Sequence, residues 1–364
     1  VNVIGGFITA KDLGPVMKIF SERHDRCCDL HKAIEKRAPV KLNYDEEAFK
    51  LSKLKAGERG YDSRKGKLDK LAEKVAEHDK LVEAARAEIA KVDAMRAKYA
   101  ADPEFQKHEA LLDNGIDLAR LTYPEVRTLR CQMQYIFQDP YSSLNPRMTV
   151  ANIIGEGLLA HKYCKKANER MHEEILQTME DCGLAPYFLH RYPHQFSGGQ
   201  RQRIGIARSL AVHPKFVVCD EAVSALDVSI QSQIINLLQD LKEQQHLTYL
   251  FITHDLSVVK YISDRIGVMY LGNLVELADS QEIFDHPMHP YTEALLESIP
   301  TTEEKRDLAV LEGDIPSPVN PPKGCKFHTR CKYCTEICTH VVPDWEEVTP
   351  NHFVACHHKL HTNE

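Results

Sequence analysis

Residues Tyr192 to Asp227, YPHQFSGGQRQRIGIARSLAVHPKFVVCDEAVSALD, constrain the fold and chemistry of this chain more than any other stretch. Within it, Ser197-Gly198-Gly199-Gln200 directly precedes a helical run from Arg201 to Leu210. Glycines let a backbone come close to an anion, and the start of a helix offers unpaired N–H groups and the positive end of its dipole. The stretch therefore predicts a turn that binds phosphate.

The same stretch contains an apolar run, Phe216 to Cys219, which predicts a buried strand that ends in Asp220-Glu221. A carboxylate at a strand end can hold Mg²⁺ through water, and the next one can polarise an attacking water. Taken singly, a glycine turn before a helix and an acidic pair after a strand are both common. Their order and close spacing favour a nucleotide site.

Together these residues resemble the ATP-binding cassette (ABC) ATPases. The resemblance implies a signature motif at Ser197–Gln200, a Walker B strand that ends at Asp220, a catalytic Glu221, and a D-loop that ends at Asp227. In that family two cassettes pair head to tail, and the signature of one closes on the ATP held by the other.

Two further strand ends fit the same resemblance. Met133 to Phe137 predicts a strand followed by Gln138, and the next residues, DPYSSLNPRMTV, resemble the Q-loop of peptide-type importers. That loop ligates the cation and also meets the membrane subunit. Thr248 to Thr253 predicts a buried strand followed at once by His254. A histidine there also suits an ordinary core, but its position resembles the switch histidine that contacts the γ-phosphate.

The first third of the chain predicts helices. Val1 to Ala10 is typical of a β-type segment interrupted by a glycine pair, and a helical region follows from Gly14 to Leu112, with a polar break near Lys55 to Gly66. Within this region a heptad seam of about four repeats predicts coiled-coil pairing with an antiparallel partner at Val16 to Ile34. The positions of the seam are Leu68, Leu71, Val75, His78, Val82, Ala85, Ile89, Val92 and Tyr99, with Arg96 as the charged interruption. A helical hairpin that packs only on itself is preferred over a specific docking arm.

The remaining elements are those that a cassette would need. TYPEVRTLR predicts a short helix, and Ala151 to Arg191 is strongly helical, like the helical subdomain that carries the signature. Ile230 to Gln244 predicts an amphipathic helix. Arg265 to Tyr270 and Asn273 to Ala278 predict two closing strands that turn at Gly272.

The C-terminal tail narrows the resemblance to the ATPase subunits of oligopeptide/dipeptide ABC importers. It contains HPMHPYTEALLESIP and GDIPSPVNPPKGCKFHTRC, and the segments SGGQRQRIGIARSL and SALDVSIQ resemble the F-type paralogue. The resemblance covers Gly115 to His357. It implies ATP and Mg²⁺ as ligands, a paralogous ATPase as partner in a heterodimer, two transmembrane permease subunits, and an extracellular peptide-binding protein reached indirectly. The expected location is the cytoplasmic face of a bacterial or archaeal cell membrane.

Cysteines are concentrated in the same tail, which holds five of the eleven in the chain. Those that match the family's C-terminal cysteines are Cys325, Cys331, Cys338 and Cys356, with Cys334 as an extra. Four thiolates suit a [4Fe–4S] cluster or tetrahedral zinc, and some family members carry the cluster. Reduced structural cysteines without metal remain the alternative.

Two departures from the family pattern stand out. Ala222 replaces the usual proline after the Walker B carboxylates, which is expected to alter the D-loop only modestly. No Gly-x4-Gly-Lys-Ser/Thr occurs, and Gly60 to Leu68 is rejected as a substitute because its spacing is wrong and it follows no strand. Truncation is the simplest explanation, and the polypeptide is not expected to bind ATP tightly by itself.

Composition and charge limit the alternatives. The net charge is −7 without a long basic run, which disfavours a nucleic-acid partner and hence a DNA-maintenance ABC ATPase. No apolar run reaches the length of a membrane-spanning helix, so a membrane role would require partner subunits. A non-catalytic partner cassette is the remaining alternative, because of the missing phosphate-binding loop.

The predicted fold is therefore an α/β ABC-type P-loop NTPase cassette, with a mixed sheet flanked by helices, a helical hairpin insertion and a small cysteine-rich C-terminal domain. The expected segments are a remnant strand at 1–12, the helical insertion at 13–114, and cassette core with the Q-loop at 115–150. The helical subdomain follows at 151–212, cassette core with Walker B, D-loop and switch histidine at 213–284, and the transporter extension at 285–364.

Overall fold

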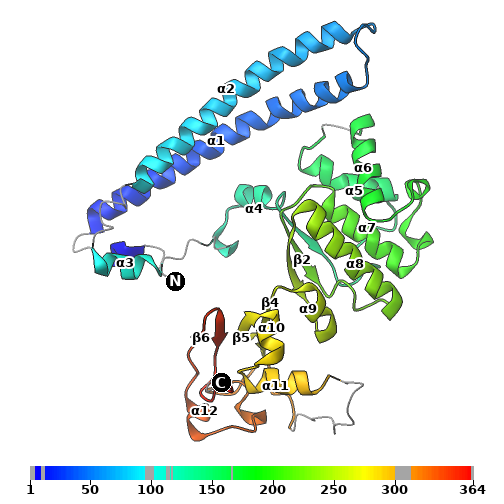
Figure 1. The fold of residues 1–364 in the computed structure, drawn as a ribbon. Helices are drawn as coiled ribbons and strands as arrows, with labels where there is room; N and C mark the ends of the chain where they lie inside the picture. Colours follow the sequence, from blue (N-terminus) through cyan, green and yellow to red (C-terminus); the bar gives the residue numbers. More distant parts are fainter. Residues whose placement is uncertain are drawn as a thin grey trace. The chain divides into compact units, whose positions relative to one another are not determined.

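The computed structural model describes residues 5–9, 13–94, 102–111, 115, 118–164, 167–299 and 313–361 (Figure 1). The chain forms two compact units, and each is described by itself. The first comprises Val1–Met133, Asn145–Gln195 and Ile206–Pro214, and the second comprises Gln134–Leu144, Phe196–Gly205 and Lys215–Glu364. Among the helices in the described part of the chain, none is both long and apolar enough to cross a membrane.

The first described residues are helical, and the prediction of a β-type segment there is wrong. Gly5–Thr9 forms a 3-10 helix, η1. Its Phe7 is 2% exposed and packs in an apolar cluster with Val16 and Phe105. A side chain at Gly6 would lie 2.5 Å from Phe105, so this glycine permits the close approach. Packing against helices, rather than pairing with a strand, thus determines the conformation of this segment.

Two long helices form an antiparallel hairpin in the first unit (Figure 1). Helix α1 spans Leu13–Ser52 and α2 spans Tyr61–Asp93. Arg23 Nε contacts Asp93 Oδ1 at 2.7 Å, and Arg37 pairs with Asp79, so the start of α1 lies beside the end of α2. The heptad positions Leu68, Leu71, Val75, His78, Val82, Ala85 and Ile89 are buried or half-buried, whereas most other α2 residues are exposed. Arg96, Tyr99 and the side chain of Val92 lie outside the described residues.

Shorter helices complete the first unit. They are α3 (Pro103–Glu109), η3 (Leu118–Arg120), α4 (Tyr123–Leu129), α5 (Val150–Ala160), α6 (Glu169–Asp181), η4 (Pro186–Phe188) and η5 (Pro193–Gln195). Thr149 and Asn168 cap α5 and α6, and each side chain accepts a hydrogen bond from the backbone three residues later. The apolar positions predicted for this region lie in the core, since Ile154, Leu158 and Met179 are at most 1% exposed.

Three strands form the first sheet, in the order β1-β2-β3. Strand β1 spans Met133–Ile136, β2 spans Phe216–Asp220 and β3 spans Thr248–Ile252, and β2 and β3 are parallel. Helices α7 (Gly198–Leu210), α8 (Val228–Gln245) and α9 (Leu256–Ile262) alternate with these strands along the chain. The prediction that β3 is buried is wrong, because Leu250 and Ile252 are 49% and 46% exposed. Only its alternate residues, Tyr249 and Phe251, are half-buried.

A second sheet is antiparallel and has the order β4-β5-β7-β6. Its strands are β4 (Arg265–Tyr270), β5 (Asn273–Asp279), β7 (His352–Val354) and β6 (Glu346–Thr349). Leu271 and Gly272 both have positive φ, as a two-residue hairpin turn requires. The helices of this region are α10 (Ser280–Asp285), α11 (Pro290–Glu297), η6 (His328–Arg330) and α12 (Glu336–His340). The strands of the cysteine-rich tail therefore extend the sheet that β4 and β5 begin.

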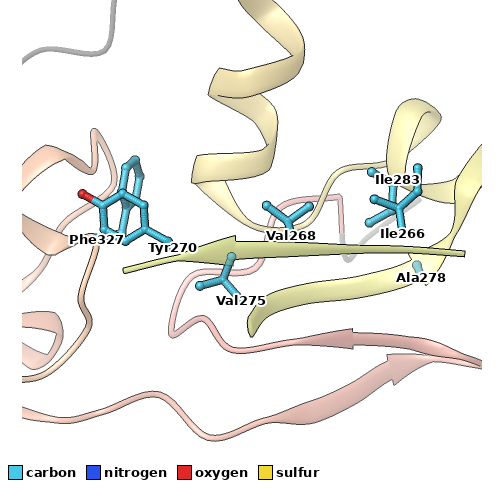
Figure 2. Packing of buried hydrophobic residues seen from close by; sticks show 7 residues of the cluster. All are labelled: Ile266, Val268, Tyr270, Val275, Ala278, Ile283 and Phe327. Atoms are coloured by element: carbon cyan, nitrogen blue, oxygen red, sulfur yellow. The ribbon is translucent and has the colours of Figure 1, made fainter. Parts of the chain in front are cut away.

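An apolar cluster and a buried carboxylate hold this second sheet together. Figure 2 shows the cluster, in which Phe327 from the tail packs against Tyr270 of β4 at 5.2 Å between ring centroids. Glu276 of β5 is fully buried and accepts hydrogen bonds from Met288 N (2.6 Å) and His289 N (3.1 Å). His352 Nε2 of β7 lies 2.8 Å from the same carboxylate. One acidic side chain thus joins three segments that are distant in sequence.

Candidate functional site

The ends of three neighbouring strands bring together Gln138, Glu221 and His254. Gln138 Nε2 donates to Glu221 Oε2, and His254 Nδ1 lies 3.1 Å from Glu221 Oε1. The three residues follow β1, β2 and β3, whose order places the glutamate between the other two. The sequence predicted these three side chains separately, and the structure joins them around one carboxylate.

The backbone of Glu221 adopts an unusual conformation. Its φ is +43°, in the left-handed region that non-glycine residues rarely occupy. Glu221 N donates to Ile252 O at 2.8 Å, and Ser224 donates to Glu221 O through both its backbone N (3.1 Å) and its Oγ (3.0 Å). These bonds stabilise the turn, and strain of this kind is typical of functional sites.

Asp220, the other carboxylate of the pair, has a partner that the sequence did not indicate. The hydroxyl of Tyr135 in β1 donates to Asp220 Oδ2. This hydrogen bond, followed by burial and the Asp220 charge, raises the pKa of Tyr135, so the phenol stays protonated and remains a donor. The side chains of Tyr135 and Asp220 meet because β1 and β2 are neighbours in the sheet, which the sequence alone does not show.

The predicted signature residues form the first turn of α7. Ser197 N donates to Gln200 Oε1 at 3.1 Å, and Gln200 N donates to Ser197 Oγ at 3.4 Å. This reciprocal pair is a capping box, which satisfies backbone groups at a helix start. Ser197 is exposed, so the start of α7 is accessible for contact with a ligand or partner.

The two glycines of this turn have different surroundings. A Cβ on Gly199 would lie 2.4 Å from Ile230 Cγ2, so Gly199 is needed for packing against α8. A Cβ on Gly198 would meet Leu226 Cδ2 at 3.6 Å, an ordinary contact. Both neighbours lie in or just after the predicted D-loop. The structure therefore places the signature turn against the D-loop.

Asp227 at the end of the D-loop is the N-cap of α8. Its Oδ1 accepts hydrogen bonds from Ser229 Oγ (2.7 Å) and Ile230 N (3.0 Å). The bond from the Ser229 hydroxyl and then that from the Ile230 backbone lower the pKa of Asp227, which keeps the carboxylate ionised. This capping role connects the D-loop to the packing of Gly199 on Ile230.

The C-terminal thiols do not support the predicted metal centre. Within the described residues, no group of three or more His, Cys, Asp or Glu side chains is arranged to hold a metal ion. Burial raises the pKa of Cys331 to about 11 and that of Cys356 to about 12, and it also raises the pKa of Cys325. Cys338 is buried as well. The predicted iron–sulfur or zinc site is therefore not supported by the described residues.

Comparison with known protein families gives two matches. Residues 275–338 match the C-terminal region of the oligopeptide/dipeptide transporter family, and residues 100–224 match the ABC transporter family. The first match contains β5 with Glu276 and the buried His289, and the second contains the strand ends with Gln138 and Glu221.

Individual relatives match over about two thirds of this chain. The oligopeptide transport ATP-binding protein AppF of Bacillus subtilis is 52% identical over 253 residues, which is 68% of this chain and 76% of that protein. A putative peptide import ATP-binding protein of Brucella ovis is 51% identical over 248 residues, 68% and 78% of the two chains. OppF of Haemophilus influenzae is 47% identical over 246 residues, 66% and 74%. A dimeric bacterial ABC transporter cassette of known structure covers 46% of this chain and 72% of its own, at 27% identity and a TM-score of 0.41.

Proposed function

Because this chain belongs to the ATP-binding subunits of oligopeptide and dipeptide ABC transporters, we propose that Gln138, Glu221 and His254 form its ATP-hydrolysing centre. The chain is an ABC-type ATPase subunit, and its hydrolysis of ATP is coupled to peptide import through transmembrane permease subunits. The observation that supports the proposed centre is the contact of Glu221 with both an amide and an imidazole at the ends of adjacent strands.

Glu221 is the residue proposed to polarise the attacking water. Its carboxylate is held from two sides, by Gln138 Nε2 and by His254 Nδ1, so it cannot rotate freely. With Nδ1 of His254 at the glutamate, Nε2 is the ring atom that would contact the γ-phosphate. A fixed carboxylate beside a phosphate-binding imidazole is the arrangement that water-orienting groups need.

Asp220 and Gln138 are the proposed contacts to Mg²⁺. Both offer oxygen atoms at the same ends of neighbouring strands, and Mg²⁺ prefers oxygen ligands, so these residues fit the ion. When bound, Mg²⁺ would neutralise charge on the phosphates of ATP. Tyr135 orients the Asp220 carboxylate through its hydroxyl. Gln138 uses Nε2 toward Glu221, which leaves its Oε1 as the amide atom for the cation.

The signature residues are proposed to act on a neighbouring cassette. Ser197, Gly198, Gly199 and Gln200 would clamp the nucleotide held by a paralogous ATPase subunit, with Asp227 shaping the D-loop between the two sites. The capping box at the exposed start of α7 supports this assignment. We further assign the chain to the F-type paralogue at the cytoplasmic face of a bacterial membrane, where it would serve an extracellular peptide-binding protein through the permeases.

Replacement of Glu221 by Gln tests the centre. The amide keeps the shape of the side chain but cannot polarise water, so ATP binding is expected to persist while turnover falls about 10²- to 10⁴-fold. Turnover is measured in a transporter assembled with a form of this subunit that carries Gly-x4-Gly-Lys-Ser/Thr, because residues 1–364 contain no such motif. Glu180→Gln, an exposed position on α6, is the matched control and should retain activity. Near-normal hydrolysis by Glu221→Gln would overturn the proposed role.

A further inference from the structure

An aromatic residue of the Q-loop contacts the first turn of the signature helix. The guanidinium carbon of Arg201 lies 4.0 Å from the centroid of the Tyr141 ring. Arg201 Nε is buried and has no hydrogen-bond partner among the described residues. The electron-rich face of the ring is therefore the contact that compensates for burial of this part of the cation.

Tyr141 is held in place relative to Gln138. Asp139 Oδ1 accepts a hydrogen bond from Tyr141 N at 2.7 Å, and Asp139 O accepts one from Ser143 N at 3.2 Å. These bonds form a tight turn directly after Gln138, whose amide contacts Glu221. A movement of Gln138 would therefore be passed to the Tyr141 ring within three residues.

Arg201 lies in the same helical turn as the signature residues. Arg201 N donates to Ser197 O at 2.9 Å, so it belongs to the first turn of α7. The Tyr141 hydroxyl lies 3.9 Å from the point where a Cβ on Gly198 would be. Leu226 Cδ2 of the D-loop lies 3.6 Å from the same point. The Q-loop and the D-loop thus meet the signature turn at one place.

We propose that Tyr141 and Arg201 are positioning residues that couple the Q-loop to the signature turn. The inference rests on the proposed function, because it concerns how the state of Gln138 and Glu221 reaches Ser197 and Gly198. Neither Tyr141 nor Arg201 belongs to the groups assigned to water, cation or phosphate. Their contact connects this chain's own hydrolytic centre to the surface that closes on the neighbouring cassette's nucleotide.

The coupling has a kinetic consequence that a purely structural contact would lack. The signature engages a nucleotide only when two cassettes close, whereas the first binding of ATP does not require it. Loss of the contact between the Arg201 guanidinium and the Tyr141 ring should therefore lower kcat and leave the KM for ATP nearly unchanged. A general loss of folded protein would instead reduce the active fraction in proportion to the loss of thermal stability.

The test is a double-mutant cycle on ATP hydrolysis by the assembled transporter. Tyr141→Leu and Arg201→Gln should each lower kcat about tenfold, equivalent to about 1.4 kcal/mol, with KM for ATP within about twofold of wild type. Tyr141→Phe keeps the ring and Arg201→Lys keeps the cation, so both should stay near wild type. The double variant should be no slower than the slower single variant, because the two residues act through one contact.

Several results would overturn the inference. They are a wild-type kcat in Tyr141→Leu or Arg201→Gln, a fall of about a hundredfold in the double variant, and a kcat that follows only the melting temperature. If one variant does not fold, the other still decides the outcome. Glu221→Gln in the same assay separates the two proposals: if it is inactive while Tyr141→Leu is fully active, only the coupling fails. If Glu221→Gln is fully active, the proposed function itself fails.

Discussion

His289, in the HPYT segment of the tail, is kept neutral by its surroundings. It is 1% exposed, and its Nδ1 accepts a hydrogen bond from Tyr291 N at 3.0 Å as the N-cap of α11. Burial lowers the pKa of His289 to about 4, although the nearby Glu276 charge opposes this shift. The imidazole therefore acts as a hydrogen-bond acceptor in the folded protein, a role that protonation would abolish.

This burial predicts loss of stability in mild acid. An unfolded histidine gains a proton below about pH 6.5, whereas folded His289 does so only near pH 4. Between these values the unfolded state binds more protons. The free energy of unfolding should therefore decrease by up to about 3 kcal/mol as the pH is lowered from above 6.5 to about 4. Urea unfolding from pH 8 to pH 4 measures this slope. His289→Asn keeps a capping side chain and should flatten it, whereas exposed His172→Asn should not.

At the residue scale, the sequence identified the groups that belong to recognisable motifs and missed those defined only by contact. Glu221 and His254 follow apolar strands in a known order, so their proximity could be anticipated. Tyr135 and Tyr141 are single aromatic residues in a strand and a loop, and no spacing distinguishes them from tyrosines whose side chains have no partner. Their partners, Asp220 and Arg201, are about 85 and 60 residues away in sequence, so only the fold could reveal the contacts.

The α1–α2 hairpin shows what periodicity can predict at the scale of elements. The seam of α2 could be predicted because apolar residues recur at heptad spacing, and the structure buries or half-buries those positions. The length of α1 could also be predicted, since the helical region expected from Gly14 to the break near Lys55 matches Leu13–Ser52 despite Pro39. The predicted partner segment for α2, however, ended at Ile34. The contacts of α1 with α2 include ion pairs, Arg23–Asp93 and Arg37–Asp79, which leave no hydrophobic period in the sequence.

Substitution at the seam should separate the two helices. Val82 is 8% exposed, and Val82→Asp would place a carboxylate among apolar side chains at a cost of several kcal/mol, about 2–5. Ala84→Asp, two residues away on the exposed face, should cost less than about 0.5 kcal/mol. Limited proteolysis across the hairpin, together with thermal melting of the helical circular dichroism signal, measures the difference. Equal sensitivity of both variants would contradict the observed seam.

Two other elements were misjudged for a common reason: apolar content was taken as a sign of strand or of burial. Gly5–Thr9 has apolar residues, but Phe7 finds its partners on helices, so the segment is a 3-10 turn. Strand β3 is apolar or aromatic after Thr248, yet only alternate residues face its packed side, while Leu250 and Ile252 stay exposed. Composition alone does not tell which face of a strand is covered.

At the scale of the whole molecule, the tail is joined to the rest of the second unit by backbone pairing and by one carboxylate. Strand β7 pairs with β5 in the register Glu276↔Val354 and Leu277↔Phe353. Glu276 then bonds the loop before α11 and the imidazole of His352. The sequence predicted a separate small C-terminal domain. It gave no indication that Glu276 would be buried or which groups it would bind.

Loss of this carboxylate should loosen the tail. Glu276→Leu would leave the N–H groups of Met288 and His289 and a ring nitrogen of His352 buried without a partner, and should lower the free energy of unfolding by about 3–5 kcal/mol. Glu276→Gln retains an acceptor oxygen and should lose less than half of that. Guanidinium unfolding measures both, and protease cleavage between 313 and 361 reports release of the tail. Equal losses would show that the hydrogen bonds to Glu276 contribute little.

Exposed carbon on the first sheet has a practical consequence for handling the purified polypeptide. Tyr135 in β1, Phe137 just after it, and Leu250 and Ile252 in β3 expose apolar side-chain area on the two outer strands of this sheet, and such area promotes self-association at high concentration. Kosmotropic salts such as ammonium sulfate strengthen this attraction, whereas mild non-ionic detergent shields it. Solubility in the test tube would thus depend on whether these side chains are covered.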